Sequence, residues 1–149
     1  MRLQDSVDLI LQQKGRQVYS ISPHATVYEA LEKMAERGIG ALVVMDGTEL
    51  VGVISERDYA RKVILEARSS KETKVWEITS SPAVTVSPKT TVDECMQRMT
   101  EERCRHLPVV EEGKVVALVS IGDLVNWIIM TQDLTIHHLE DYICGKYPG

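Results

Sequence analysis

The sequence contains no phenylalanine, and aromatic residues make up only 5% of its 149 residues. Its core must therefore be built from Val, Ile, Leu, Met and Ala. Long apolar stretches are also missing, because no run approaches the roughly 20 residues that a membrane-spanning helix needs. The first 17 residues mix acids and glutamines with apolar residues, which is typical of neither a secretory signal nor a transit peptide. We therefore expect a cytoplasmic protein with no membrane partner.

Cysteine is scarce, and positive charge is in deficit. The three cysteines, Cys95, Cys104 and Cys144, form no Cys-x-x-Cys pair, which favours a reducing compartment over a disulfide framework. The formal net charge is -5, and an acidic chain repels polyanions, so we expect no nucleic-acid partner. Two local basic clusters suit a small phosphate better than a duplex; they are Arg57, Arg61 and Lys62, and Arg103, Arg105 and His106.

Motifs of catalysis are absent as well: the sequence has no Gly-x-Ser-x-Gly, no His-Glu-x-x-His and no Walker loop. Cys104 and His106 lie two residues apart on an expected strand and thus on one face, where a nucleophile and a base could meet. Two structural strand positions are the simpler interpretation. His137 and His138 have no third ligand nearby and fit an exposed helix face. We expect neither a catalytic site nor a metal site.

An internal repeat organises the chain. Residues 21–58 align without a gap with residues 86–123, so that Pro23 falls on Pro88 and Asp58 on Asp123, both at an offset of 65 positions. Further identical pairs lie along the whole alignment, among them Ser22/Ser87, Thr26/Thr91, Glu29/Glu94, Met34/Met99 and Ser55/Ser120.

Each repeat shows the same order of expected elements. A short strand at 18–21 or 83–86 ends before Ser-Pro, and Thr-x-x-Glu then predicts a capping box that opens a helix. Two strands joined by a glycine turn follow, at 41–45 and 50–54 or at 106–110 and 115–119, and a second helix begins near Ser55 or Ser120. We expect an α/β (α+β) fold of two tandem β-α-β-β-α units in pseudo-twofold packing. The expected divisions are an N-terminal helical arm at 1–17, a first unit at 18–70, a linker and second unit at 71–131, and an amphipathic C-terminal helix at 132–149.

A Ser-x-x-Asp sequence follows the last strand of each repeat, at Ser55 to Asp58 and at Ser120 to Asp123. It could simply cap the next helix, which stabilises a protein by about 1 kcal/mol. However, Asp is one methylene shorter than the Glu of the first helices, and we take this to disfavour the reciprocal bond to the N-cap amide. A carboxylate at a strand end could instead accept hydrogen bonds from both ribose hydroxyls, while a helix N-terminus and nearby Arg meet a phosphate. The residues alone leave capping and binding equally open.

The two expected crevices between the repeats differ in charge. Residues 103–106, Arg-Cys-Arg-His, align with residues 38–41, Gly-Ile-Gly-Ala. One crevice therefore gains a positive rim, while the other gains small residues and room.

These residues resemble the CBS domain, and the whole chain is similar to a stand-alone bacterial CBS pair, or Bateman module. The resemblance covers residues 18–130 and is strongest in LVGVISERDYARK and CRHLPVV…VVALVSIGDLV. It implies an adenine-nucleotide ligand, AMP, ATP or NAD(H), or alternatively S-adenosylmethionine, held in clefts between the two motifs. It implies ribose binding by Ser55, Asp58, Ser120 and Asp123, and phosphate binding by Arg57, Arg61, Arg105 and His106.

The resemblance also implies which residues complete each cleft. The Asp58 side would be joined by Arg105, His106, Leu107 and the backbone of Ala83, Val84 and Thr85. The Asp123 side would be joined by Gly40, Ala41 and the backbone of Tyr19, Ser20 and Ile21. A homodimer is implied, acting as a non-catalytic sensor on a separate, unidentified regulated protein. The alternative is a structural dimerisation module with unoccupied clefts.

Overall fold

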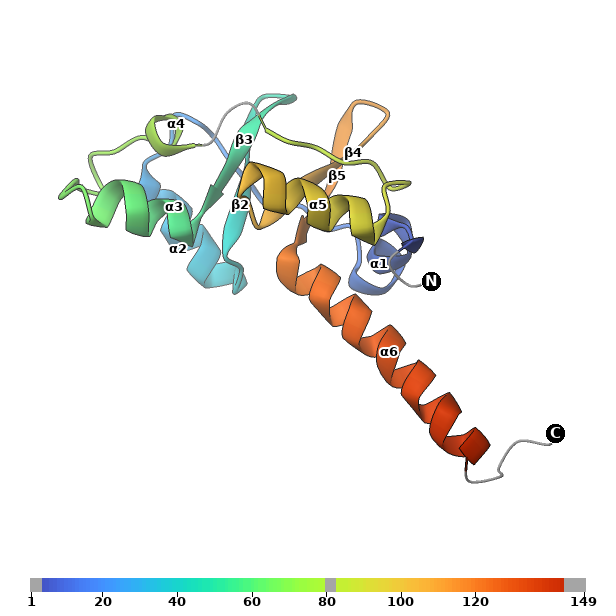
Figure 1. The fold of residues 1–149 in the computed structure, drawn as a ribbon. Coiled ribbons are helices and arrows are strands. Elements are labelled where there is room, and N and C mark those ends of the chain that lie inside the picture. Colours follow the sequence, from blue (N-terminus) through green and yellow to red (C-terminus); the bar gives the residue numbers. More distant parts are fainter. Residues whose placement is uncertain (1–3, 80–82, 144–149) are drawn as a thin grey trace.

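Two lobes, one for each repeat, lie side by side in a computed structural model that describes residues 4–79 and 83–143, with side chains up to residue 132 (Figure 1). The first lobe contains β1 (Ser20–Ile21), α2 (Val27–Arg37), β2 (Ala41–Asp46), β3 (Glu49–Ser55), α3 (Glu56–Tyr59) and the π-helical turn η2 (Ala60–Ile64). The second contains α5 (Val92–Glu102), β4 (His106–Glu111), β5 (Lys114–Ser120) and α6 (Ile121–Ile143). The predicted pair of mixed α and β units is confirmed.

The sheets follow the predicted order, with shorter first strands than expected. In the first lobe β1 pairs parallel with β2, which pairs antiparallel with β3. In the second lobe β4 and β5 form an antiparallel pair, and the expected strand at 83–86 is reduced to a single parallel bridge between Val86 and Val109. Both hairpins shift register at the same place in the repeat, between Val44 and Met45 and between Val109 and Val110.

The helices begin where the capping residues predict. The Thr26 hydroxyl accepts a hydrogen bond from the Glu29 amide at 3.1 Å, and Thr91 does the same for Glu94 at 3.2 Å. At the other end, the expected C-terminal helix at 132–149 is not separate, because α6 runs without a break over 23 residues to Ile143. Residues 144–149 lie outside the described part of the chain. Within the described residues, no helix is both long and apolar enough to cross a membrane.

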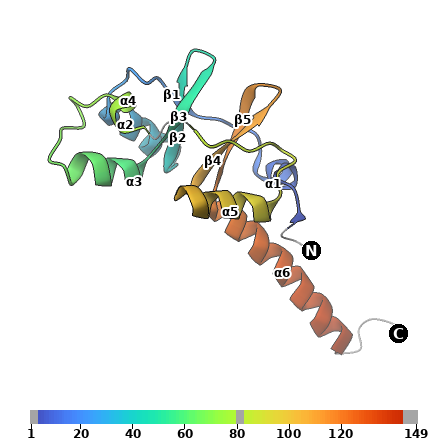
Figure 2. The same ribbon diagram turned by 45° about the horizontal axis from the view of Figure 1, so that its top comes forward.

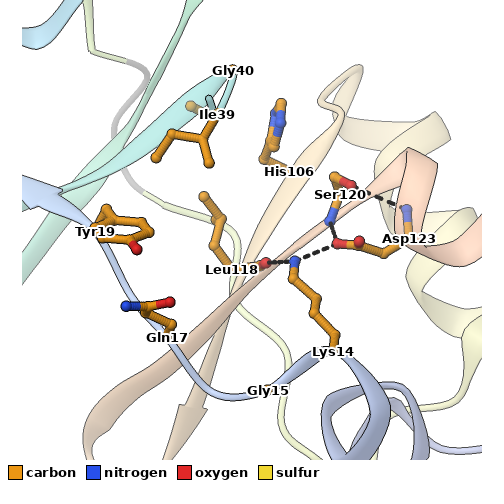
Figure 3. A pocket seen from close by; sticks show the side chains of 11 residues that line it. Lys14, Gly15, Gln17, Tyr19, Ile39, Gly40, His106, Leu118, Ser120 and Asp123 are labelled. Carbon is orange, nitrogen blue, oxygen red and sulfur yellow. Dashed lines mark hydrogen bonds and ion pairs between the residues drawn. The ribbon is translucent and has the colours of Figure 1, made fainter. Parts of the chain in front are cut away.

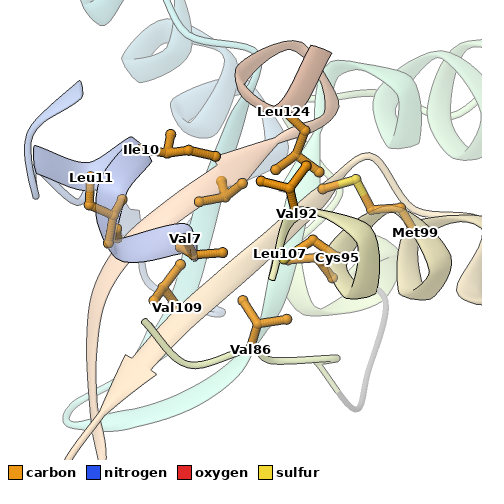
Figure 4. Close-up of a cluster of buried hydrophobic side chains, with 12 residues drawn as sticks. Val7, Ile10, Leu11, Val86, Val92, Cys95, Met99, Leu107, Val109 and Leu124 are labelled. Atoms are coloured by element: carbon orange, nitrogen blue, oxygen red, sulfur yellow. The ribbon is translucent and has the colours of Figure 1, made fainter. Parts of the chain in front are cut away.

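The short helix before each repeat packs on the other repeat. Helix α1 (Val7–Lys14) lies against the second lobe, whereas α4 (Val75–Ile78) lies against the first, as both ribbon views show (Figures 1 and 2). Three side chains of α1 enter the core of the second lobe beside Leu107 and Leu124 (Figure 4); they are Val7, Ile10 and Leu11, with exposed fractions of 0%, 4% and 1%.

Matching backbone hydrogen bonds hold each short helix on the other repeat, an arrangement that we call the exchange. The Val7 amide donates to Thr90 O at 2.8 Å, and the Val92 amide donates to Asp5 O at 2.9 Å. The first lobe repeats the pattern, because the Val75 amide donates to Ala25 O at 2.9 Å and the Val27 amide donates to the carbonyl of residue 73 at 2.8 Å. Each core is thus completed by a segment that belongs in sequence to the other repeat, and this holds the two lobes together.

The exchange predicts that α1 is part of the folded core. We expect Leu11→Ala to lower the free energy of unfolding by about 2–5 kcal/mol, because it leaves a cavity in the second lobe. Leu9→Ala is the matched control: this neighbour on the same helix is 39% exposed, and its loss should cost no more than about 0.5 kcal/mol. Urea unfolding measures both. Equal effects of the two substitutions would show that α1 does not belong to the core.

Candidate ligand-binding clefts

Two cavities open between the lobes, one at each Ser-x-x-Asp sequence. The Asp58 cleft has a volume of about 420 Å³, and the Asp123 cleft has a volume of about 380 Å³. The Asp58 cleft is lined by Gly40, Val53, Ser55, Glu56, Arg57, Asp58, Arg61, Lys62, Arg103, Cys104, Arg105 and His106. The Asp123 cleft is lined by Lys14, Gly15, Gln17, Tyr19, Ile39, Gly40, Ala41, His106, Leu118, Ser120 and Asp123. Each cleft therefore takes residues from both repeats.

Both Asp side chains cap the helix that follows, and the expectation that Asp is too short for this was wrong. The Ser55 amide donates to Asp58 Oδ2 at 2.9 Å, and the Ser120 amide donates to Asp123 Oδ2 at 2.8 Å. The Ser hydroxyls accept in return from the amides of Asp58 and Asp123. The first turn of the helix brings the Asp Cβ close enough to the N-cap amide for the shorter side chain to reach it. Capping uses Oδ2 and leaves Oδ1 of each carboxylate for other partners.

Cations dominate the Asp58 cleft. Lys62 Nζ lies 3.6 Å from Asp58 Oδ1 and donates to Ile78 O at 3.0 Å. Arg103 ends α5 in the left-handed conformation, with φ of 54°, where the first repeat has Gly38. A residue with a side chain is disfavoured in this conformation by roughly 1–2 kcal/mol. The chain accepts this strain at a position that adds a guanidinium to the rim of the cleft. The predicted residues Arg57, Arg61 and Arg105 line the same cavity.

The Asp123 cleft contains a cation that the sequence did not predict. Lys14, the last residue of α1, places its Nζ 2.5 Å from Asp123 Oδ2 and 2.7 Å from Leu118 O (Figure 3). Gln17 and Tyr19, on the segment after α1, form another wall of the cavity. No local pattern indicates this contact, because it joins residues more than 100 positions apart in the sequence.

His106 lies between the two clefts and lines both of them, whereas the sequence had placed it with Asp58 alone. Burial lowers the pKa of His106 below its usual value; Asp123 and Asp58 oppose this shift, whereas Lys14 and Arg105 add to it. The imidazole is therefore harder to protonate than a free histidine, and it borders both cavities. A proton on His106 would change the electrostatic potential in both cavities.

Several residues expected to contact a ligand do not line either cavity. Leu107 is fully buried in the second core, because it follows His106 on β4 and neighbouring side chains of a strand point to opposite faces. The carbonyls of Ser20 and Thr85 accept hydrogen bonds from Lys33 and Arg98 of their own repeats. Three other residues expected to contact a ligand also line neither cavity: Ile21, Ala83 and Val84. Of these, Ile21 packs against the core of the first lobe and Val84 against the core of the second.

The surroundings of Cys104 do not activate its thiol. Burial raises the pKa of the Cys104 thiol, with the His106 backbone amide partly opposing the shift, so the thiolate is disfavoured at neutral pH. Among residues 4–79 and 83–132, no group of three His, Cys, Asp or Glu side chains is placed to hold a metal ion. His137 and His138 lie outside the residues whose side chains are described.

Comparison with known proteins agrees with the duplicated fold. A family model described as the CBS domain matches residues 15–65 and 75–130. The solved structure of a protein with CBS domains from Burkholderia ambifaria has a TM-score of 0.81 and 49% sequence identity, covering 86% of this chain and 96% of that one. A hexameric CBS-CP12 protein from bloom-forming cyanobacteria shares 25% identity with a TM-score of 0.73, covering 81% of this chain and 69% of that one.

A curated relative is similar over most of the chain. The mitochondrial CBS domain-containing protein CBSX3 of Arabidopsis thaliana is 42% identical over 127 residues, which is 82% of this chain. The matched part is 62% of that relative's own length, so the likeness does not extend to the whole of it. The residues matched by the family model include both Ser-x-x-Asp sequences, whereas Lys14 of the Asp123 cleft lies just outside them. The chain belongs to the CBS-domain family and carries two CBS domains.

Proposed function

We propose that the protein is a regulatory module that binds an adenine nucleotide, AMP, ATP or NAD(H), in the clefts between its two CBS domains. One observation carries the proposal: a carboxylate at a helix N-terminus faces a cavity of about 420 or 380 Å³ in each repeat. The role is binding and signalling rather than catalysis, which fits the disfavoured thiolate of Cys104.

Ribose binding is supported by the carboxylate oxygens that helix capping does not use. Asp58 Oδ2 accepts from the Ser55 amide and hydroxyl, and Asp123 Oδ2 accepts from the Ser120 amide and Lys14. The Oδ1 atoms retain lone pairs for a ribose hydroxyl. The two side chains are 19% and 24% exposed, so a hydrogen bond to them is partly shielded from water. The cap holds each carboxylate in place before a ligand arrives, which reduces the entropy lost on binding.

Phosphate binding is supported mainly at the Asp58 cleft. Arg57 comes from α3, which carries Asp58, and Arg61 comes from the π-helical turn η2 that follows it. Arg103 and Arg105 come from the opposite repeat. Guanidinium groups bind phosphate through paired hydrogen bonds. A nucleotide between these groups would join the two lobes and change the equilibrium between their arrangements, and thereby the affinity for a regulated protein. We also propose self-association as a homodimer, a proposal supported by the hexameric CBS-CP12 relative.

A structural module with unoccupied clefts is the second candidate. The complete capping boxes favour it, since they give both Asp residues a role without any ligand.

Thermal unfolding distinguishes nucleotide binding from a purely structural function. We expect millimolar AMP, ATP or NAD(H) to raise the melting temperature, because a ligand that binds only the folded state stabilises it. If none of these, nor S-adenosylmethionine, shifts the transition, the structural function is the correct one.

Removing the Asp58 carboxylate should weaken nucleotide binding at its cleft. We expect Asp58→Ala to lower the affinity by about a hundredfold, because hydrogen bonds to an ionised acceptor contribute roughly 1.5–3 kcal/mol each. Isothermal titration calorimetry with ATP measures the change. Glu77→Ala is the matched control: Glu77 Oε2 accepts from the Lys74 amide at 2.7 Å and caps α4 outside both clefts. Equal affinities of the two variants would contradict the site assignment.

Nucleotide binding should depend on pH through His106. Burial lowers the pKa of His106 in the free protein, and a bound phosphate beside it would raise that pKa again. Binding then takes up a proton, so the affinity should rise as the pH falls from about 7.5 to 6. Calorimetry across this range measures the slope. His106→Gln controls for titration of the phosphate itself, and an unchanged slope in that variant would exclude His106 as the source.

A further inference from the structure

The repeat alignment shows that the Asp123 cleft lacks the cations of its counterpart. At the offset of 65 positions, Arg57, Arg61 and Lys62 are replaced by Gly122, Asn126 and Trp127. On the opposite wall, Arg103 and Arg105 are replaced by Gly38 and Gly40. Neither repeat therefore supplies a lysine or arginine to the Asp123 cleft at any of these five positions.

Lys14 restores one cation from outside the repeats. In the Asp58 cleft, Lys62 Nζ lies 3.6 Å from the Asp58 carboxylate; in the Asp123 cleft, Lys14 Nζ lies 2.5 Å from the Asp123 carboxylate. An ammonium beside the capping carboxylate is thus common to both clefts, although the two lysines come from unrelated places in the chain. Among the residues that line the Asp123 cleft, Lys14 is the only lysine or arginine.

The placement of Lys14 is fixed by the docking of α1. Three buried side chains and the backbone pairing with residues 90–92 hold the helix on the second lobe. The Asp5 carboxylate also accepts a hydrogen bond from Trp127 Nε1 at 3.0 Å. The Lys14 side chain is 36% exposed, so its ammonium faces the cavity while remaining open to water. The helix therefore presents the cation at a defined position in the cleft.

We propose that Lys14 sets the ligand specificity of the Asp123 cleft, as the cation that recognises the phosphate of a nucleoside monophosphate. This rests on the proposed function. A single lysine matches one phosphate group, whereas the several arginines of the Asp58 cleft match a polyphosphate chain. The ammonium sits on a flexible four-carbon stem, and it therefore reaches a phosphate while the ribose binds Asp123 Oδ1.

Comparison of AMP with adenosine tests this role, because the two differ only in the phosphate. Calorimetry is done on Asp58→Ala protein, in which the other cleft is weakened. We expect Lys14→Gln to reduce AMP affinity about tenfold to a hundredfold, the range for one hydrogen bond to a charged group, and to leave adenosine affinity undiminished. Lys14→Arg keeps the charge and should keep most of the AMP affinity.

Arg16→Gln is the matched control on the same arm. Arg16 pairs with Asp8 and Glu111 and lines neither cleft, so its loss tests the docking of the arm without touching the cavity. The inference alone is overturned if the ratio of AMP affinity to adenosine affinity is the same with and without Lys14. It is also overturned if Arg16→Gln lowers this ratio as much as Lys14→Gln does. If the Asp58→Ala protein, which retains Lys14, does not bind AMP, both the inference and the proposed function of this cleft are wrong.

Discussion

The reciprocal packing of α1 and α4 is the constraint on which the rest of the structure depends. Neither repeat encloses its core with its own residues, since Val7, Ile10 and Leu11 complete the second core and Val75 and Ile78 complete the first. The two lobes must therefore stay adjacent for either to be fully packed. Adjacent lobes bring the N-terminus of each second helix opposite the other repeat, and this creates the clefts.

The same packing forms two similar clefts whose walls differ in charge. The repeated fold places a helix-capping carboxylate in each cleft, at Asp58 and at Asp123. The two carboxylates accept nearly the same hydrogen bonds. The residues around the two carboxylates differ. Arginines line the cleft of Asp58, while helix α1, which packs on the second lobe, brings Lys14 to Asp123. His106 lines both clefts, so its side chain belongs to the wall of each. Capping and binding are therefore compatible roles of one carboxylate, because the cap uses Oδ2 and positions Oδ1.

Most of the fold could be predicted from the sequence because the repeat shows each pattern twice. Thr26 and Thr91 mark the helix starts, and apolar runs joined by a glycine turn in 41–55 and 106–120 mark the hairpins. Nothing local indicates that α1 packs on the distant repeat, so Lys14 was not predicted as a cleft residue. Leu107 was assigned to a cleft by resemblance, although its neighbour His106 faces the cavity and strand alternation turns Leu107 into the core. The reach of Asp to the N-cap amide depends on backbone geometry, which side-chain length alone does not reveal.

A crystal structure of the protein grown with ATP tests the central claim most directly. We expect the ribose to lie within hydrogen-bonding distance of Asp58 Oδ1, with the phosphates among Arg57, Arg61 and Arg105 and the two lobes contacting the same nucleotide. ATP bound away from both clefts, or clefts that stay empty at millimolar ATP, would contradict the claim that the paired CBS domains form a nucleotide-binding module.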